Sequence, residues 1–215
     1  MLSRMPAPER RNQLVEAALT IASRSGVASV TVRAVAEEAG VSLGVVHYCF
    51  QDKEEMVTAM GQALVLQLAG SIDTLVDLIV TQMDEPPSGQ SGLRDLLYRG
   101  LMAMWAHIES VPNRELLTYE ITCYALRSRP SGSEASSRIA EEQYRVMDAQ
   151  AFEFLDRAAA LTRTTWTEPL VDLARMTILS IDGFVLRWLV DRDAEAVRRQ
   201  IELLAGRLAA AAVAR

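Results

Sequence analysis

The sequence predicts an all-α fold, and two observations support this prediction. Apolar residues recur every three or four positions through most of the 215 residues, as Leu14, Ala18 and Ile21 do near the N-terminus. Stretches rich in glycine, proline and serine separate the periodic segments, most clearly over residues 86–92. No segment shows the alternation of apolar and polar residues that is typical of a strand, so we expect helices throughout.

Each expected helix has a recognisable beginning or end. Gly26 ends a first helix that begins near Glu9, because glycine is favoured just beyond a helix C-terminus. Thr31 and Ser42 are typical N-caps for two short helices, which Gly40 separates. We expect further helices over residues 53–83, which Gly70 can interrupt, and over 92–109, 114–128, 134–162, 168–191 and 194–213.

Composition excludes several classes of protein. Half of the residues are hydrophobic and 23% are charged, which favours a packed core over disorder. No apolar run approaches the roughly 18 residues of a membrane helix, and none resembles a signal peptide, so we expect a cytoplasmic protein that does not bind membranes. Two cysteines far apart in sequence and two histidines argue against a disulfide and a metal site.

The charge is distributed unevenly along the chain. The net charge is −6, which by itself argues against binding to nucleic acid. Residues 1–53, however, carry six basic and five acidic side chains, a net charge of +1 that leaves −7 on the remainder. This asymmetry suits a DNA-binding N-terminal region on an acidic body.

Residues 31–50 have the spacing of a helix-turn-helix. Ala36, Gly40 and Val46 stand at positions i, i+4 and i+10. Two closely crossing helices require a small residue at their contact, and a tight turn between them favours glycine. The outer face of the second helix would then enter the DNA major groove. Since short helices joined by glycine also occur in other helical proteins, the spacing alone leaves the function open.

A wider segment is more specific, because residues 10–60 resemble the DNA-binding region of TetR-family regulators. The matching residues stand in the family's order and spacing, and they are Gly26, Thr31, Val35, Ala36, Ala39, Gly40, Val41, Ser42, Gly44, Phe50 and Lys53. The rest of the chain resembles the family in length, helical character and the Asp182–Gly183 pair. The resemblance implies a helix-turn-helix DNA-binding domain over residues 1–52. It also implies a helical bundle over residues 53–215 that binds ligand and dimerises.

The resemblance also implies which residues contact a palindromic, double-stranded operator. Thr31 and Arg33 would approach phosphates, and Lys53 would meet a phosphate at the N-terminus of the next helix. Leu43 departs from the polar residue common in the family and favours a thymine methyl group. The remaining contacts implied for the recognition helix are Ser42, Gly44 and Val45 at its start and His47 and Tyr48 further along. Cys49 also departs from the family and is either a redox sensor or an inert thiol.

Several residues of the second region are candidates for contact with a small, largely hydrophobic effector. Methionine and aromatic side chains provide adaptable apolar lining, although each also fits an ordinary core. Glu120 and Asp182 are acids among apolar neighbours, and each either orients a ligand or pairs with an arginine. The candidate ligand contacts are Met102, Trp105, Tyr119, Glu120, Tyr124 and Asp182, with Met104, Met147, Phe152 and Trp188 as further lining.

The last two expected helices carry apolar stripes that suit a homodimer interface. One stripe comprises Val197, Ile201, Leu204 and Leu208, and the other comprises Leu179, Leu186 and Val190. Such stripes are buried either within one subunit or between two, and the sequence leaves both alternatives open. A dimer would place two DNA-binding heads on adjacent half-sites.

These observations predict a ligand-responsive, DNA-binding transcriptional regulator. The resemblance to the TetR family implies that it is a repressor, which the effector releases from its operator. Two other classes remain open: an α-helical adaptor whose N-terminal region binds protein, and an enzyme that uses Glu120 and Asp182 as an acid/base pair. The sequence contains no nucleophile elbow, phosphate-binding loop or dinucleotide fingerprint. We therefore expect no enzymatic activity and no cofactor.

Overall fold

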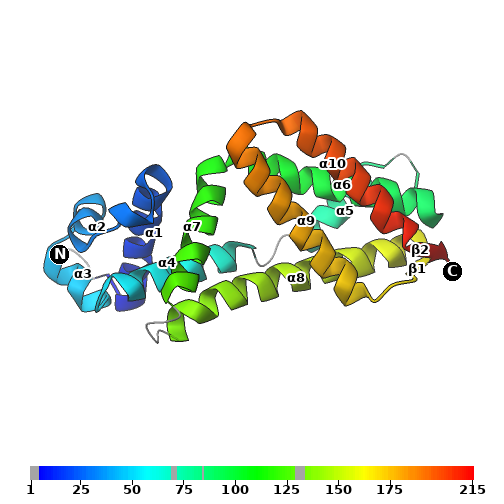
Figure 1. Ribbon diagram of the computed structural model, residues 1–215. Coiled ribbons are helices and arrows are strands. Elements are labelled where there is room, and N and C mark those ends of the chain that lie inside the picture. The colour runs from blue at the N-terminus through cyan, green and yellow to red at the C-terminus, as the bar shows by residue number, and fades with distance from the viewer. Residues whose placement is uncertain (1–4, 69–71, 84, 129–133) are drawn as a thin grey trace. The chain divides into compact units, whose positions relative to one another are not determined.

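The computed structural model describes residues 5–68, 72–83, 85–128 and 134–215 (Figure 1). Within these residues the chain is helical except for short connections and one small strand pair, which confirms the all-α prediction. The elements are α1 (Ala7–Ser25), η1 (Val27–Ser29, a 3-10 helix), α2 (Val32–Glu38), α3 (Leu43–Cys49), α4 (Lys53–Leu68), α5 (Ile72–Thr81), α6 (Gly89–Ser110), α7 (Pro112–Ser128), α8 (Glu134–Thr162), β1 (Thr164–Trp166), α9 (Leu170–Asp191), α10 (Ala194–Ala210) and β2 (Ala212–Ala214).

The chain forms two compact units. The head unit comprises residues 1–67 and 113–143, and the body unit comprises residues 68–112 and 144–215. The head unit therefore contains nearly all of α4 and α7 and the start of α8 in addition to α1–α3. These units do not coincide with the expected boundary between residues 52 and 53, because long helices pack against the N-terminal three. The division into a DNA-binding domain and a ligand domain remains a prediction about function.

A continuous apolar core holds the head unit together. Leu14 and Ala18 of α1 are fully buried, as are Val35 of α2 and Val46 of α3. The core continues through the α4 residues Met56 and Met60 to the α7 residues Leu117 and Ile121. Gly61 lets α4 approach α8 closely, since a Cβ atom there would lie 2.5 Å from Ile139 Cγ2.

In the body unit, α10 packs alongside α6 (Figure 1). The buried side of α6 includes Leu93 and Leu97. Its Gly100 faces the ring of Phe154 on α8, where an added Cβ would stand only 2.3 Å from the ring. The side chain of Gln90 donates hydrogen bonds to the Ala209 and Ala212 carbonyl oxygens, both at 3.0 Å, and so ties the start of α6 to the end of α10.

A short strand pair is the main departure from the expected helices. β1 and β2 pair antiparallel, with Thr165 opposite Val213, so that α10 ends at Ala210 rather than near residue 213. The segment after α8 is threonine-rich and ends in tryptophan, and these residues favour an extended backbone. The Thr164 hydroxyl is buried 3.0 Å from that of Thr162, which anchors β1 to the end of α8. Strands of three residues are too short to show an alternating pattern.

The expected helix over residues 53–83 is divided into α4 and α5. Gly70, the expected point of interruption, lies outside the described residues. Among the described residues, none of the helices combines the length and the apolar character that a membrane span needs.

Candidate nucleic-acid interface

Local hydrogen bonds shape the turn between α2 and α3. The Thr31 hydroxyl accepts a hydrogen bond from the Ala34 N–H at 3.1 Å, which caps the start of α2. Gly40 adopts a positive φ of 65° just beyond the end of α2. The N–H of Val41 then donates to the Ala36 carbonyl oxygen at 2.9 Å, and that of Gly40 donates to the Glu37 carbonyl oxygen at 3.2 Å. This is the Schellman arrangement, in which glycine avoids the steric cost of a left-handed residue.

The two helices of the motif bury one side and expose the other. Val46 is the one fully buried residue of α3, and it packs in the head core with Val35 and Ala36 of α2. On the outer side, the side chain of Leu43 is 50% exposed and that of Tyr48 is 82% exposed. Of the other predicted DNA contacts of this motif, Thr31, Arg33, Ser42, Gly44 and His47 are exposed, and Val45 is half-buried.

Gly44 leaves the backbone open near the start of α3. A Cβ atom added there would have only the Ser42 hydroxyl within 4 Å, at 3.9 Å. The glycine is therefore not required by packing inside the head unit. It costs the short helix about 1 kcal/mol of helix propensity relative to alanine. Close approach of another molecule to this backbone is a physical reason for its presence.

Lys53 has a partner within the head unit. Its Nζ donates a hydrogen bond to the Ala28 carbonyl oxygen at 3.1 Å, which ties the first residue of α4 to η1. An ammonium group has three donors, so this contact leaves donors for a phosphate. The predicted phosphate contact stays a prediction.

Sequence reasoning did not single out two residues of α1 that contact the motif. Gln13 Nε2 donates a hydrogen bond to the Ala39 carbonyl oxygen at 3.2 Å, at the end of α2. Arg11 donates to the Cys49 carbonyl oxygen at 2.6 Å, at the end of α3. Their partners are backbone atoms 26 and 38 residues away, and no local sequence signal identifies such contacts.

Comparison with known proteins agrees with this geometry. Residues 14–60 match the family described as bacterial regulatory proteins, tetR family. Over 188 residues the chain is 30% identical to the HTH-type nicotine-responsive transcriptional repressor HdnoR of Paenarthrobacter nicotinovorans, an alignment that covers 87% of this chain and 88% of that protein. The chain belongs to the TetR family. It is a helix-turn-helix DNA-binding transcriptional regulator, as the sequence predicted.

Solved structures agree on the fold along the whole chain. A TetR-family regulator from Mesorhizobium loti superposes with a TM-score of 0.72 at 16% identity and covers 98% of this chain and 100% of its own. The multidrug binding protein EbrR, solved in complex with imidazole, superposes with a TM-score of 0.55 at 23% identity over 92% of this chain and 95% of its own. The TetR-family fold therefore extends beyond the N-terminal motif to the body unit.

The predicted ligand contacts of this TetR-family chain are divided between the two units. Met102, Trp105 and Asp182 belong to the body unit. Tyr119, Glu120 and Tyr124 lie on α7 and belong to the head unit. This division could not be predicted from the sequence, because α7 follows α6 without a recognisable domain linker.

Two tryptophans pack together in the body unit. The rings of Trp105 and Trp188 meet edge to face, with centroids 5.2 Å apart and an interplanar angle of 82°. The guanidinium of Arg192 lies 4.6 Å from the centre of the Trp188 ring. Trp105 is 2% exposed, and its Nε1–H has no acceptor among the described residues. A buried N–H without an acceptor costs about 1–3 kcal/mol, so this donor favours any acceptor that reaches it.

On α7, Glu120 contacts η1 within the head unit. Its Oε2 accepts a hydrogen bond from the Val27 N–H at 2.8 Å. A Cβ atom at Gly26 would lie 3.3 Å from the same oxygen, so glycine at this position makes room for the carboxylate. One turn later, burial raises the pKa of Tyr124, and the carboxylates of Glu54 and Asp52 raise that pKa further. Both side chains therefore face the α1–α4 part of the head unit.

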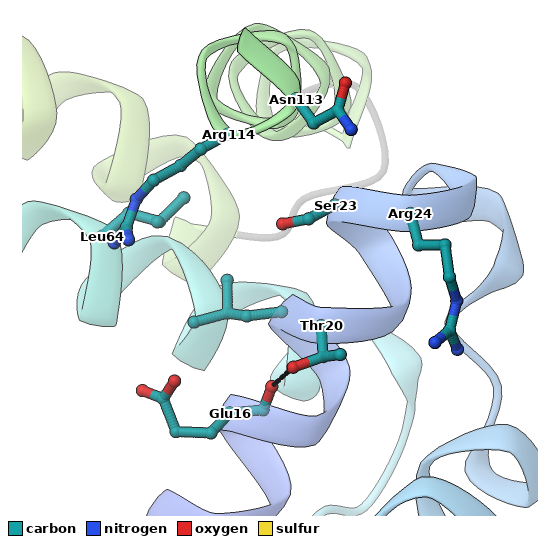
Figure 2. Close-up of a pocket in the computed structure, with 8 residues that line it drawn as sticks. Glu16, Thr20, Ser23, Arg24, Leu64, Asn113 and Arg114 are labelled. Atoms are coloured by element: carbon teal, nitrogen blue, oxygen red, sulfur yellow. Dashed lines mark hydrogen bonds between the residues drawn. The ribbon is translucent and has the colours of Figure 1, made fainter. Parts of the chain in front are cut away.

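A polar cleft of about 490 Å³ opens on the head unit (Figure 2). Thr20 and Ser23 of α1 lie on one side of it, and Asn113 and Arg114 of α7 lie on the other. Its remaining lining residues are Glu16, Leu19, Arg24 and Leu64. None of these residues is among the predicted ligand contacts, which stay predictions. Among the described residues, no group of three or more His, Cys, Asp or Glu side chains is arranged to hold a metal ion.

The two apolar stripes of the last helices have different surroundings. Val197, Ile201, Leu204 and Leu208 of α10 are buried within the subunit. On α9, by contrast, Leu179 is 63% exposed, Leu186 is 53% exposed and Val190 is 78% exposed. The subunit therefore covers the first stripe and leaves the second open.

Proposed function

We propose that this TetR-family regulator is a dimeric repressor that a small, largely hydrophobic effector releases from a palindromic operator. The observation that carries the proposal is the exposed outer face of α3, with its open backbone at Gly44 and its large exposed side chains Leu43 and Tyr48. A helix inserted into the major groove requires such a face. Residues 1–52, together with Lys53 at the start of the second region, would supply the DNA contacts predicted above. Residues 53–215 would bind the effector and dimerise.

The exposed stripe on α9 supports dimerisation through the last two helices. Met176, Leu179, Gly183, Leu186 and Val190 are all exposed and follow a three-four-three-four spacing, which keeps one seam facing a partner helix. An added Cβ at Gly183 would meet nothing within 4 Å, so glycine there leaves space for a close helix crossing. A pair of heads held about 34–36 Å apart would then read two half-sites.

The body unit supports an effector that is mostly apolar with a hydrogen-bond acceptor. Trp105 offers a buried, unpaired N–H beside the Trp188 ring, and an acceptor on the effector would satisfy it. Two similar proteins have names that refer to small molecules: HdnoR is described as nicotine-responsive, and EbrR is described as a multidrug binding protein. HdnoR is also described as a repressor, which supports repression here.

Release would follow from a population shift. The effector must bind the conformer with low operator affinity more tightly than the conformer with high affinity, since equal binding would shift nothing. An allosteric coupling of about 1–3 kcal/mol would change operator affinity about 5–150-fold. α4 and α8 carry residues of both units, so either helix gives a covalent route between effector and head.

The test begins with selection of an operator from random-sequence duplexes by the purified chain. We expect sequence-dependent binding that weakens steeply with salt. In Lys53→Ala, binding to every duplex should weaken and the salt slope should decrease by about one, as for a lost phosphate contact.

Nicotine then serves as the first effector probe, with a Trp105→Phe variant as the control that lacks the indole N–H. A folded dimer that binds no duplex at low ionic strength would overturn the proposal.

A further inference from the structure

The N-terminal part of α1 holds both helices of the DNA-binding motif by their C-terminal ends. Gln13 donates to the last turn of α2 through the Ala39 carbonyl, and Arg11 donates to the last residue of α3 through the Cys49 carbonyl. The final carbonyl groups of a helix have no partner within the helix and form its negative end. A cationic donor is therefore well matched to the Cys49 carbonyl oxygen, at 2.6 Å.

Arg11 makes more than this one contact. The same Nη1 lies 2.9 Å from Glu55 Oε1 on α4, and the guanidinium stacks 4.3 Å from the centre of the Phe50 ring. Glu55 Oε2 accepts the N–H of Gln51 at 2.8 Å. Through one planar group, Arg11 therefore connects α1 to the end of α3, to the turn that follows it and to the first turn of α4.

Helix α3 depends on its ends for orientation. It has only seven residues, and Val46 is the one among them that is fully buried. A single buried side chain does not by itself prevent a short helix from tilting or rotating. The Gly40 turn fixes the N-terminal end of α3, and the contacts of Arg11 fix the C-terminal end, next to His47 and Tyr48.

We propose that Arg11 is a positioning residue for operator recognition: it sets the orientation of α3 and so the specificity of base reading, without itself contacting DNA. Its guanidinium is already engaged with a carbonyl, a carboxylate and an aromatic face, and only 36% of its side chain is exposed. Arg11 also precedes residues 14–60, which are the part matched by the family model. The proposal rests on the proposed role of α3 in reading the operator.

The experiment compares Arg11→Met with the unmodified full chain and with Arg24→Met. The control removes the same charge from the same helix and breaks the Arg24–Glu38 ion pair, at 3.0 Å, but does not touch α3. Each protein is titrated with the selected operator and with a scrambled duplex of equal length, at several salt concentrations. In Arg11→Met we expect operator affinity to fall at least about tenfold, with scrambled-duplex affinity nearly unchanged and the same salt slope. Arg24→Met should retain the ratio between the two affinities.

Two further measurements separate positioning from a general structural role. Amide hydrogen exchange in residues 46–51 should accelerate in Arg11→Met, while exchange in α1 and α2 stays unchanged. Arg11→Lys should restore part of the specificity, since lysine can donate to the Cys49 carbonyl but lacks the planar fork and the stacking surface. If Arg11→Met does not fold, Glu55→Gln tests the same assembly, and its ratio of operator to scrambled affinity should fall.

Three results would overturn the inference. One is a uniform loss for all duplexes with a salt slope shallower by about one, which would make Arg11 a phosphate contact. Another is a ratio of operator affinity to scrambled-duplex affinity that is the same in Arg11→Met as in Arg24→Met. The third result concerns the case in which Arg11→Met does not fold. In that case, a ratio of operator to scrambled-duplex affinity in Glu55→Gln equal to that of the unmodified chain would overturn the inference. Failure of the unmodified chain to bind any duplex would instead reject the proposed function itself.

Discussion

Helices α9 and α10 both carry apolar stripes of helical periodicity, yet the subunit buries one and exposes the other. On α10, Ile201 is 2% exposed and packs within the body unit, whereas Leu179 and Leu186 of α9 are more than half exposed. Ion pairs join α10 to α6 beside the buried stripe, between Arg94 and Glu202 at 3.1 Å and between Arg198 and Glu109 at 3.4 Å.

This difference shows what an apolar stripe can and cannot indicate. An apolar stripe predicts that one face of the helix packs against another apolar surface. It does not indicate whether that surface belongs to another helix of the same subunit or to a second subunit. The subunit itself covers the α10 stripe, whereas the α9 stripe stays exposed and is the one that we propose a second subunit covers.

The largest effect is expected where the stripe is core. In Ile201→Ala the truncated side chain leaves a cavity beside α6, and the free energy of unfolding should fall by about 2–5 kcal/mol. Chemical denaturation followed by circular dichroism measures this loss. Gln200→Ala, at the exposed neighbouring position, should change stability by less than about 0.5 kcal/mol. A loss in Ile201→Ala as small as that of the control would show that the α10 stripe is not core.

A large effect of a different kind is expected on α9. In Leu186→Glu a carboxylate would have to be desolvated in the proposed subunit interface. We expect the dimer dissociation constant to rise about 100-fold, roughly 2.7 kcal/mol, while helix content stays the same. Sedimentation across a range of concentrations measures the change. Leu161→Glu, an equal change at an exposed position of α8, should leave the dimer intact; a stable dimer in Leu186→Glu would remove α9 from the interface.

The comparison also explains which features the sequence could predict. The cap of α2 at Thr31 and the end of that helix at Gly40 depend on neighbours within one or two helical turns, and both were predicted. The hydrogen bond from the Val27 N–H to Glu120 joins residues 93 positions apart, and local patterns do not show such contacts.

Other features could not be predicted from the sequence, because they too depend on contacts between distant parts of the chain. The strands β1 and β2 contain three residues each, and they pair because the fold brings residues 164–166 and 212–214 together. Arg11 is one of several arginines in the N-terminal region, and its neighbours do not distinguish it from the others. The fate of each apolar stripe depends in the same way on which helices the fold places beside it.

Tyr48 sharpens the comparison, because it is exposed on a helix that we propose binds DNA rather than protein. In Tyr48→Ala the loss of a large, 82% exposed side chain removes little packing within the head. We expect operator affinity to fall about tenfold, which corresponds to about 1.4 kcal/mol. Fluorescence anisotropy with the selected operator measures this loss, and sedimentation of the same sample should show an unchanged dimer. Retained affinity would exclude Tyr48 from the interface, and a dissociated dimer would assign it to subunit contacts instead.

The smallest effect concerns the turn that joins the two helices. Asp191, at the end of α9, accepts hydrogen bonds from Arg187 at 2.6 Å and from the Asp193 N–H at 3.1 Å, and the Arg187 bond is the main cause that lowers its pKa below the ordinary 3.8. Its carboxylate therefore stabilises the fold above that pH, and the contribution disappears as pH falls through the lowered pKa.

In Asp191→Asn the melting temperature should lie slightly below that of the unmodified chain near neutral pH, and the difference should shrink below about pH 4. The same substitution in an Arg187→Gln background should have a smaller effect at neutral pH, since the main donor is already absent. A difference in melting temperature that grows as pH falls would mean that Asp191 is more stabilising when protonated. The hydrogen bonds to its carboxylate would then not be what stabilises the turn between α9 and α10.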